Sequence, residues 1–170
     1  MISTYQSPTR SKPTSTFKAK GRVLIACEDS QAADELVAIL KKANLRPEWA
    51  KDFTSACKLL KTGKFHVVFA TPRVSGDSWQ KLMDFARGRG QALSFVIVAR
   101  SFDLSDWASC LKYGAFEVLD SISEISRVGD VATQALSAAW ALAGQASERH
   151  EIMELHDLTP FNAECPEVAT

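Results

Sequence analysis

The sequence predicts an α/β fold in which a doubly wound, five-stranded parallel sheet lies between two layers of helices. Two observations predict it. Short apolar runs alternate along the chain with segments whose apolar residues recur at helical spacing, and the clearest runs are apolar throughout, as in strands covered on both faces. The 170 residues, 46% of them hydrophobic and 24% charged, are enough for one globular domain.

Five segments have the composition of short strands. They are residues 23–27, 46–51, 66–70, 95–99 and 116–119. The first and third, Val-Leu-Ile-Ala-Cys and His-Val-Val-Phe-Ala, are the clearest strands buried on both faces. Because strands alternate with helices, we expect parallel pairing with right-handed crossovers.

Five helices are expected between and after these strands. The first begins near Ser30, a suitable N-cap, and carries apolar residues three or four apart up to Leu40. The others are expected at residues 54–60, 79–87, 104–113 and 123–147. Gly114 ends the fourth helix, and residues 71–77 are expected to form a turn-rich loop.

The charges divide the chain into three parts. Residues 1–20 are predicted to be a flexible basic arm rich in Ser, Thr and Pro, residues 21–147 the folded domain with a long last helix, and residues 148–170 an acidic tail. The net charge is zero, yet residues 1–22 hold five basic residues and no acid. Since the first strand begins where the last helix ends, the arm and the tail should attract each other at low salt.

Several classes of protein are excluded. The first residues lack the apolar core of a signal peptide, and no apolar run is long enough to span a membrane, so we expect a cytoplasmic protein. The four cysteines are widely spaced, which favours reduced thiols over disulfides or a zinc site. His150, Glu154 and His156 are interpreted as part of a solvated charged helix end. No metal or cofactor is expected.

Three segments carry a resemblance to a known family. VLIACEDS, FHVVFATPRVSGDSW and KYGAFEVL resemble the first strand, the third strand with its loop, and the fifth-strand region of CheY-like receiver domains of bacterial response regulators. The resemblance covers roughly residues 22–145 and implies the flavodoxin-like (βα)5 fold. It also implies a pocket for phosphoryl transfer to an aspartate, at the carboxyl ends of the strands.

The residues of that pocket depart from the family pattern. The resemblance places the Mg²⁺-binding acidic pair at Cys27 and Glu28 or at Glu28 and Asp29, the acceptor aspartate at Ala70 or Thr71, the Ser/Thr position at Ala99 with Ser101 two residues later, and the lysine at Ser121. The switch aromatic falls at Val118. Because acceptor, lysine and hydroxyl are lost together, we expect a pseudo-receiver that does not accept phosphate. Glu28 and Asp29 are the remaining candidates for a cation, and Asp77 is expected to cap the next helix.

The function expected is signalling by protein–protein interaction or by dimerisation through the fourth and fifth helices, and not catalysis. The expected partner face is Trp107, Tyr113, Val118 and Trp140, and the seam of small residues on the last helix is Ala132, Ala135, Ala139 and Ala143. One alternative is a regulator switched by a small ligand, by oxidation of Cys27 or by Ser/Thr phosphorylation. Another, nucleic-acid regulation, is disfavoured because no basic helical segment follows the domain.

Overall fold

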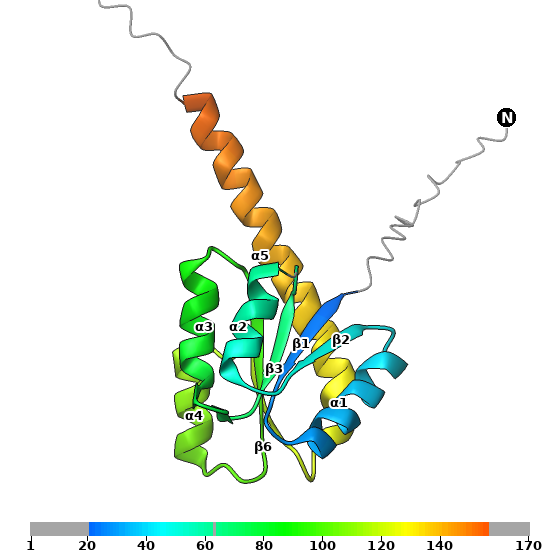
Figure 1. Cartoon of the computed structure of the whole chain (residues 1–170). Coiled ribbons are helices and arrows are strands. Elements are labelled where there is room, and N and C mark those ends of the chain that lie inside the picture. The colour runs from blue at the N-terminus through cyan, green and yellow to red at the C-terminus, as the bar shows by residue number, and fades with distance from the viewer. Residues whose placement is uncertain (1–20, 63, 157–170) are drawn as a thin grey trace, which may run out of the picture.

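The parallel sheet is formed as predicted. A computed structural model of the chain describes residues 21–62 and 64–156, and its side chains up to residue 144 (Figure 1). The strands of the main sheet are β1 (Arg22–Ala26), β2 (Arg46–Ala50), β3 (Val67–Ala70), β6 (Ser94–Ala99) and β7 (Glu117–Asp120). They pair in parallel in the order β2-β1-β3-β6-β7, which confirms the doubly wound (βα)5 topology.

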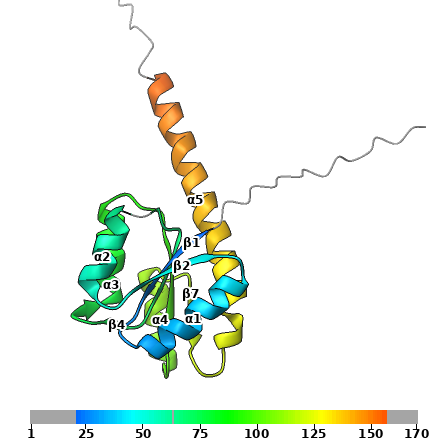
Figure 2. The ribbon, with the colours of Figure 1, turned by 45° about the vertical axis from the view of Figure 1, so that its right-hand side comes forward.

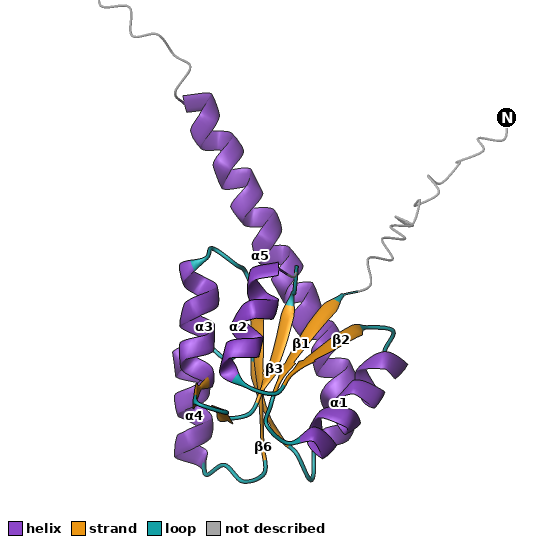
Figure 3. Ribbon diagram, viewed as in Figure 1, coloured by secondary structure: helices purple, strands orange, loops and turns teal. Residues whose placement is uncertain are grey.

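Helices cover both faces of the sheet (Figure 3). They are α1 (Ser30–Lys42), α2 (Phe53–Thr62), α3 (Trp79–Gly88), α4 (Leu104–Tyr113), the short 3-10 helix η1 (Ile125–Arg127) and α5 (Val128–His156). One core lies between the sheet and α1 with α5, and a second core lies between the sheet and α2, α3 and α4. Strand β1 serves both, because Leu24 and Ala26 point into the second core whereas Val23 and Ile25 point into the first.

Local structure differs from prediction at two helix starts. The N-cap of α1 is Asp29 and not Ser30: one carboxylate oxygen of Asp29 accepts hydrogen bonds from the backbone N–H groups of Gln31 (2.9 Å) and Ala32 (3.3 Å). Asp77 does not cap α3, because Ser78 holds the N-cap position and Asp77 forms an ion pair with Lys81 at 2.6 Å.

The predicted loop after β3 contains a two-stranded hairpin. Its strands β4 (Arg73–Val74) and β5 (Asp77–Ser78) pair in antiparallel fashion, and Gly76 at the turn has a positive φ of 97°. Strands of two residues have no periodicity to recognise, so hydropathy did not reveal them.

Helix α5 begins later and ends later than predicted, at Val128 and His156, and it extends well beyond the sheet (Figures 1 and 2). Ala132 and Ala135 are fully buried in the core under α1 and α5, and Ala139 is 1% exposed. The expected dimer seam is therefore wrong for these three residues, because they are already buried within the chain. Ala143 alone of the four is exposed.

Strand β1 begins at the same end of the sheet at which α5 leaves it (Figure 1). Gly21 there lies directly against Leu136 of α5. The predicted arm, residues 1–20, lies outside the described residues, as do Cys165 and most of the predicted tail. The attraction between the basic arm and the acidic tail stays a prediction.

Gly114 ends α4 in a left-handed backbone conformation that favours glycine. It has φ 117°, and a β-carbon placed on it would collide with the guanidinium of Arg87. We expect Gly114→Ala to lower the free energy of unfolding by about 1–3 kcal/mol in urea denaturation. Gly88→Ala is the control, because nothing lies within 4 Å of its β-carbon position; equal losses in both variants would contradict this account.

Candidate functional site

A cavity of about 300 Å³ lies where strands β1, β3, β6 and β7 end. Seven of the eight predicted pocket residues line it, namely Cys27, Asp29, Ala70, Thr71, Ala99, Ser101 and Ser121. The ladder between β6 and β7 continues into the cavity wall, since the N–H of Ser121 donates to the carbonyl of Ala99 at 2.8 Å. The structure therefore brings most of the predicted pocket residues together at one cavity, whose apolar character was not predicted.

The cavity walls are mainly apolar. Apolar residues that sequence reasoning did not single out line it or lie directly beneath it: Ala32 and Leu36 from α1, Phe69 from β3, Pro72, Val98 from β6, and Ile125 from η1. Exposed charged residues, Asp29, Glu35 and Arg100, stand at its edge. The helical spacing of Ala32, Glu35 and Leu36 directly after the first strand was the one signal that could have placed α1 against the cavity.

Glu28 is the predicted residue that the cavity does not include. It lines a separate hollow together with Arg73 and Asp77 of the hairpin. Asp29 is engaged as the N-cap of α1, so the two carboxylates face different hollows. Among the side chains that the structure describes, no three His, Cys, Asp or Glu gather into a group that could hold a metal ion.

Cys27 is buried, with 1% of its surface exposed. Its thiol donates a hydrogen bond to the carbonyl of Asp29 at 3.4 Å, and the indole N–H of Trp49 donates to the carbonyl of Cys27 at 3.0 Å. Burial, followed by the negative charge of Asp29, raises the pKa of the Cys27 thiol to about 11. Because the thiolate is the reactive form, this environment weighs against Cys27 as an oxidation sensor.

Alkylation measures this protection. At pH 8 we expect Cys27 of the native chain to react with iodoacetamide about 100-fold more slowly than a thiol of ordinary pKa, because so little of it is ionised. Peptide mapping by mass spectrometry gives the rate for each cysteine, and the urea-unfolded chain is the control. Equal rates for Cys27 in the native and unfolded chains would contradict the expectation.

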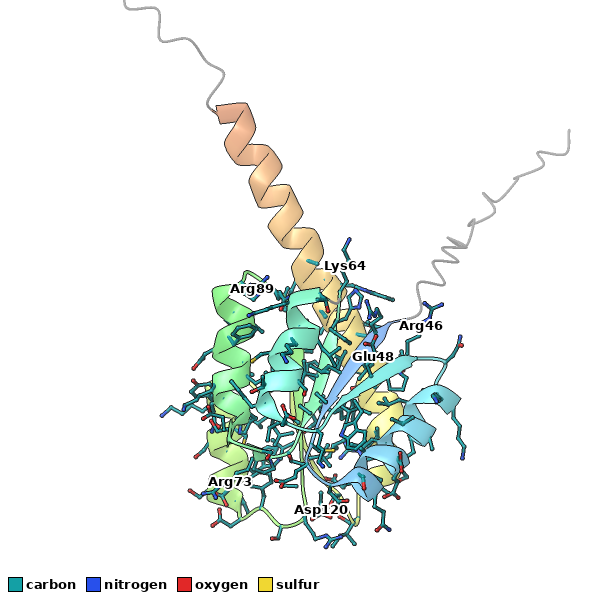
Figure 4. All side chains as sticks on the ribbon, in the orientation of Figure 1. Arg46, Glu48, Lys64, Arg73, Arg89 and Asp120 are labelled. Carbon is teal, nitrogen blue, oxygen red and sulfur yellow. The ribbon has the colours of Figure 1, made fainter. Side chains whose placement is uncertain are left out.

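The loop after β7 is closed by hydrogen bonds to carboxylates. One oxygen of Asp120 accepts from the N–H groups of Ile122 and Ser123, each at 2.8 Å, and Glu124 accepts from the N–H of Asp120 at 3.0 Å. These backbone hydrogen bonds lower the pKa of Asp120 and of Glu124. Figure 4 places Asp120 at the carboxyl-end edge of the sheet, far from Lys64 and Arg46 at the other edge.

Acid should therefore destabilise the domain through this loop. A carboxyl whose pKa is lower in the folded than in the unfolded chain stabilises the fold above its unfolded pKa, and loses that contribution as pH falls through the folded value. We expect the free energy of unfolding to decline below about pH 4.5, with a shallower decline in Asp120→Asn. Urea titrations at pH 3 to 7 measure this, and identical slopes for both proteins would contradict it.

The four residues of the expected partner face do not form one surface. Val118 is buried, with 3% of its surface exposed, so its place on that face is wrong: its position in β7 turns it toward the core below α4. Trp107 is 42% exposed and lines a hollow with Val118 and Asp120 at the carboxyl ends of the strands. Trp140 lies beside His66 at the opposite end of the sheet, with ring centroids 5.9 Å apart.

Tyr113 is partly exposed, yet it is engaged within the molecule. Its hydroxyl donates to a carboxylate oxygen of Asp84 at 2.6 Å, and its ring meets Trp79 edge to face with centroids 5.5 Å apart. It thus fastens α4 to α3. Of the predicted set, Trp107 remains the best-exposed residue near the cavity end of the sheet.

Solved structures of receiver domains share this fold. The signal receiver domain of a LuxO repressor protein from Vibrio parahaemolyticus is similar with a TM-score of 0.67 and 14% identity, over 73% of this chain and 95% of that chain. The receiver domain of NarL from Mycobacterium tuberculosis has a TM-score of 0.62 and 16% identity, over 69% and 97%. The beryllofluoride-activated NtrC4 receiver domain dimer has a TM-score of 0.64 and 20% identity, over 69% and 98%.

At these identities the likeness establishes the fold, that of CheY-like receiver domains. No protein-family model matches the sequence, and no curated protein matches it. Among the described residues, no helix combines the length and the apolar character that crossing a bilayer requires.

Proposed function

We propose that this chain is a pseudo-receiver, a signalling domain of the two-component type that works without aspartyl phosphorylation and acts by binding a protein partner. The observation that carries the proposal is the composition of the cavity. At the end of β3, where the resemblance requires the acceptor carboxylate, stand the buried Ala70 and the half-buried Thr71.

Phosphoryl transfer to a carboxylate needs positive charge to neutralise the phosphate. Ser121 stands at the position of the family lysine, and Glu28 and Asp29 line different hollows. The hydroxyl of Thr71 donates to the carbonyl of Arg73 at 2.6 Å. These features support a domain whose fold is retained for binding after its phosphate chemistry has been lost.

Beryllofluoride, which mimics an aspartyl phosphate, tests the proposal directly. We expect the full chain with Mg²⁺ and beryllofluoride to show no saturable change in amide NMR shifts at residues 70–78, and incubation with acetyl phosphate to add no mass. A gain of about 80 Da, the mass of one phosphoryl group replacing a proton, would overturn the proposal. Asp77→Asn tests the one carboxylate of that loop. Loss of the added mass in this variant would identify Asp77 as the acceptor.

The binding role has its own test. Exposed apolar side chains near the cavity end of the sheet, above all Leu104 (85% exposed) and Trp107 (42%), support a contact there. Capture from native-cell lysate by the full chain, compared with Trp107→Ala, measures it. We expect the captured amount of at least one protein to be lower with the Trp107→Ala chain than with the unsubstituted chain. Capture unchanged by it would contradict the placement of the contact on this surface.

A further inference from the structure

We propose that the cavity at the strand ends is a binding site for a small, neutral, mainly apolar ring compound of about the size of indole. This inference rests on the proposed function in one respect, namely that the cavity serves no phosphoryl chemistry. The position of the cavity in the sheet is the first argument. In the order β2-β1-β3-β6-β7 the chain reverses direction across the sheet between β1 and β3, and doubly wound sheets bind ligands at the strand ends beside this reversal.

The cavity lies at that place. Cys27 directly after β1, and Phe69 and Ala70 at the end of β3, all line it. The cavity owes its size to small side chains at strand ends and on α1, namely Ala32, Ala70, Ala99 and Ser121.

The floor is held by the core and does not depend on loops. Phe69 is 0% exposed, Leu36 3% and Val98 6%, and all three belong to the core under α1 and α5. Because this core is close-packed, these walls are expected to keep their shape when the cavity is empty. A preformed site loses little binding free energy to ordering.

Size and lining select the class of ligand. An apolar cavity of about 150 Å³ binds benzene, so the 300 Å³ here has room for a two-ring compound. The hydroxyls of Ser101 and Ser121 provide hydrogen-bonding groups for one polar substituent among apolar walls, and the oxygen of Thr71, whose proton is donated to the carbonyl of Arg73, remains an acceptor.

Charge at the cavity edge disfavours an anion. Two carboxylates, Asp29 and Glu35, stand there against a single cation, Arg100. Asp29 also occupies the N-terminus of α1, where a bound anion would otherwise find N–H donors. A phosphorylated or carboxylated compound would therefore meet more negative than positive charge, whereas a neutral ring would not.

Ligand titration tests the inference on the full ¹⁵N-labelled chain, with indole as the probe and benzoate as its charged counterpart. We expect indole to cause saturable amide shifts at Ala70, Ala99 and Ser121, and to bind at least about tenfold more tightly than benzoate. Absence of saturable shifts at these residues would overturn the inference, as would tighter binding of benzoate.

Ala32→Leu fills the cavity from α1 with a residue that favours helix. We expect it to weaken indole binding about tenfold or more, as added methylenes in an apolar pocket do. The control is Ala38→Leu, on the exposed face of the same helix, which should bind indole as the unsubstituted chain does. Equal affinity in both variants, each with an unchanged far-UV CD spectrum, would overturn the inference. If Ala32→Leu does not fold, the shifts of the unsubstituted chain still decide it.

The two proposals fail separately. A saturable beryllofluoride response overturns the pseudo-receiver assignment whatever indole does. Failure of indole to bind in a chain without a beryllofluoride response overturns the ligand site alone.

Discussion

Replacing Trp79 by alanine is expected to lower the free energy of unfolding by about 3–5 kcal/mol, a large share of the 5–15 kcal/mol that stabilises a typical domain. Trp79 opens α3 and is 2% exposed within the core under α2, α3 and α4. Its ring also meets Tyr113 of α4 edge to face. The substitution therefore leaves a cavity and removes the contact that joins two helices.

Guanidinium denaturation followed by far-UV CD measures this loss without relying on tryptophan fluorescence. Trp107→Ala is the matched control, because Trp107 is 42% exposed. This substitution should lower the free energy of unfolding by less than about 1 kcal/mol. If the two variants were equally destabilised, Trp79 would not be the anchor that its burial indicates.

Phe69→Ala is expected to cost a similar 3–5 kcal/mol for a related reason. Phe69 is fully buried in β3 on the side of α1 and α5, directly beneath the cavity. Both the fold and the floor of the cavity depend on this one side chain. Stability should therefore fall together with the selectivity for a ring of indole size.

Guanidinium denaturation gives the loss of stability, and indole titration of the folded variant gives the change in affinity. Phe116→Ala is the control: Phe116 precedes β7, is 38% exposed and does not line the cavity, so the variant should lose little stability and bind indole normally. A Phe69→Ala protein as stable as Phe116→Ala would show that the site collapses around the missing ring.

The order and type of the main elements could be predicted because each depends on local hydropathy. The run of residues 95–99 is apolar at every position, and β6 indeed spans Ser94–Ala99 with all of its residues buried. Helix α5 ran past its predicted end for an equally local reason, because the segment after Gly144 holds good helix formers and no proline to stop it.

The site was only partly predictable, since its residues come from distant parts of the chain. Cys27, Ala70, Ala99 and Ser121 could be named in advance because they follow strands, and strand ends of a parallel sheet meet at one edge. Ile125 could not, because nothing in its own segment shows that η1 closes over that edge.

By itself, then, the sequence determined the layered α/β fold and the end of the sheet at which the residues that follow its strands gather. Those features follow from residue type and from periodicity along the chain. Only the tertiary structure decided that Glu28 and Asp29 face different hollows, that Val118 is buried, that Cys27 is shielded, and that the strand ends enclose a mainly apolar cavity. Each of these depends on which way a side chain points once strands and helices pack, and packing is a property of contacts between segments.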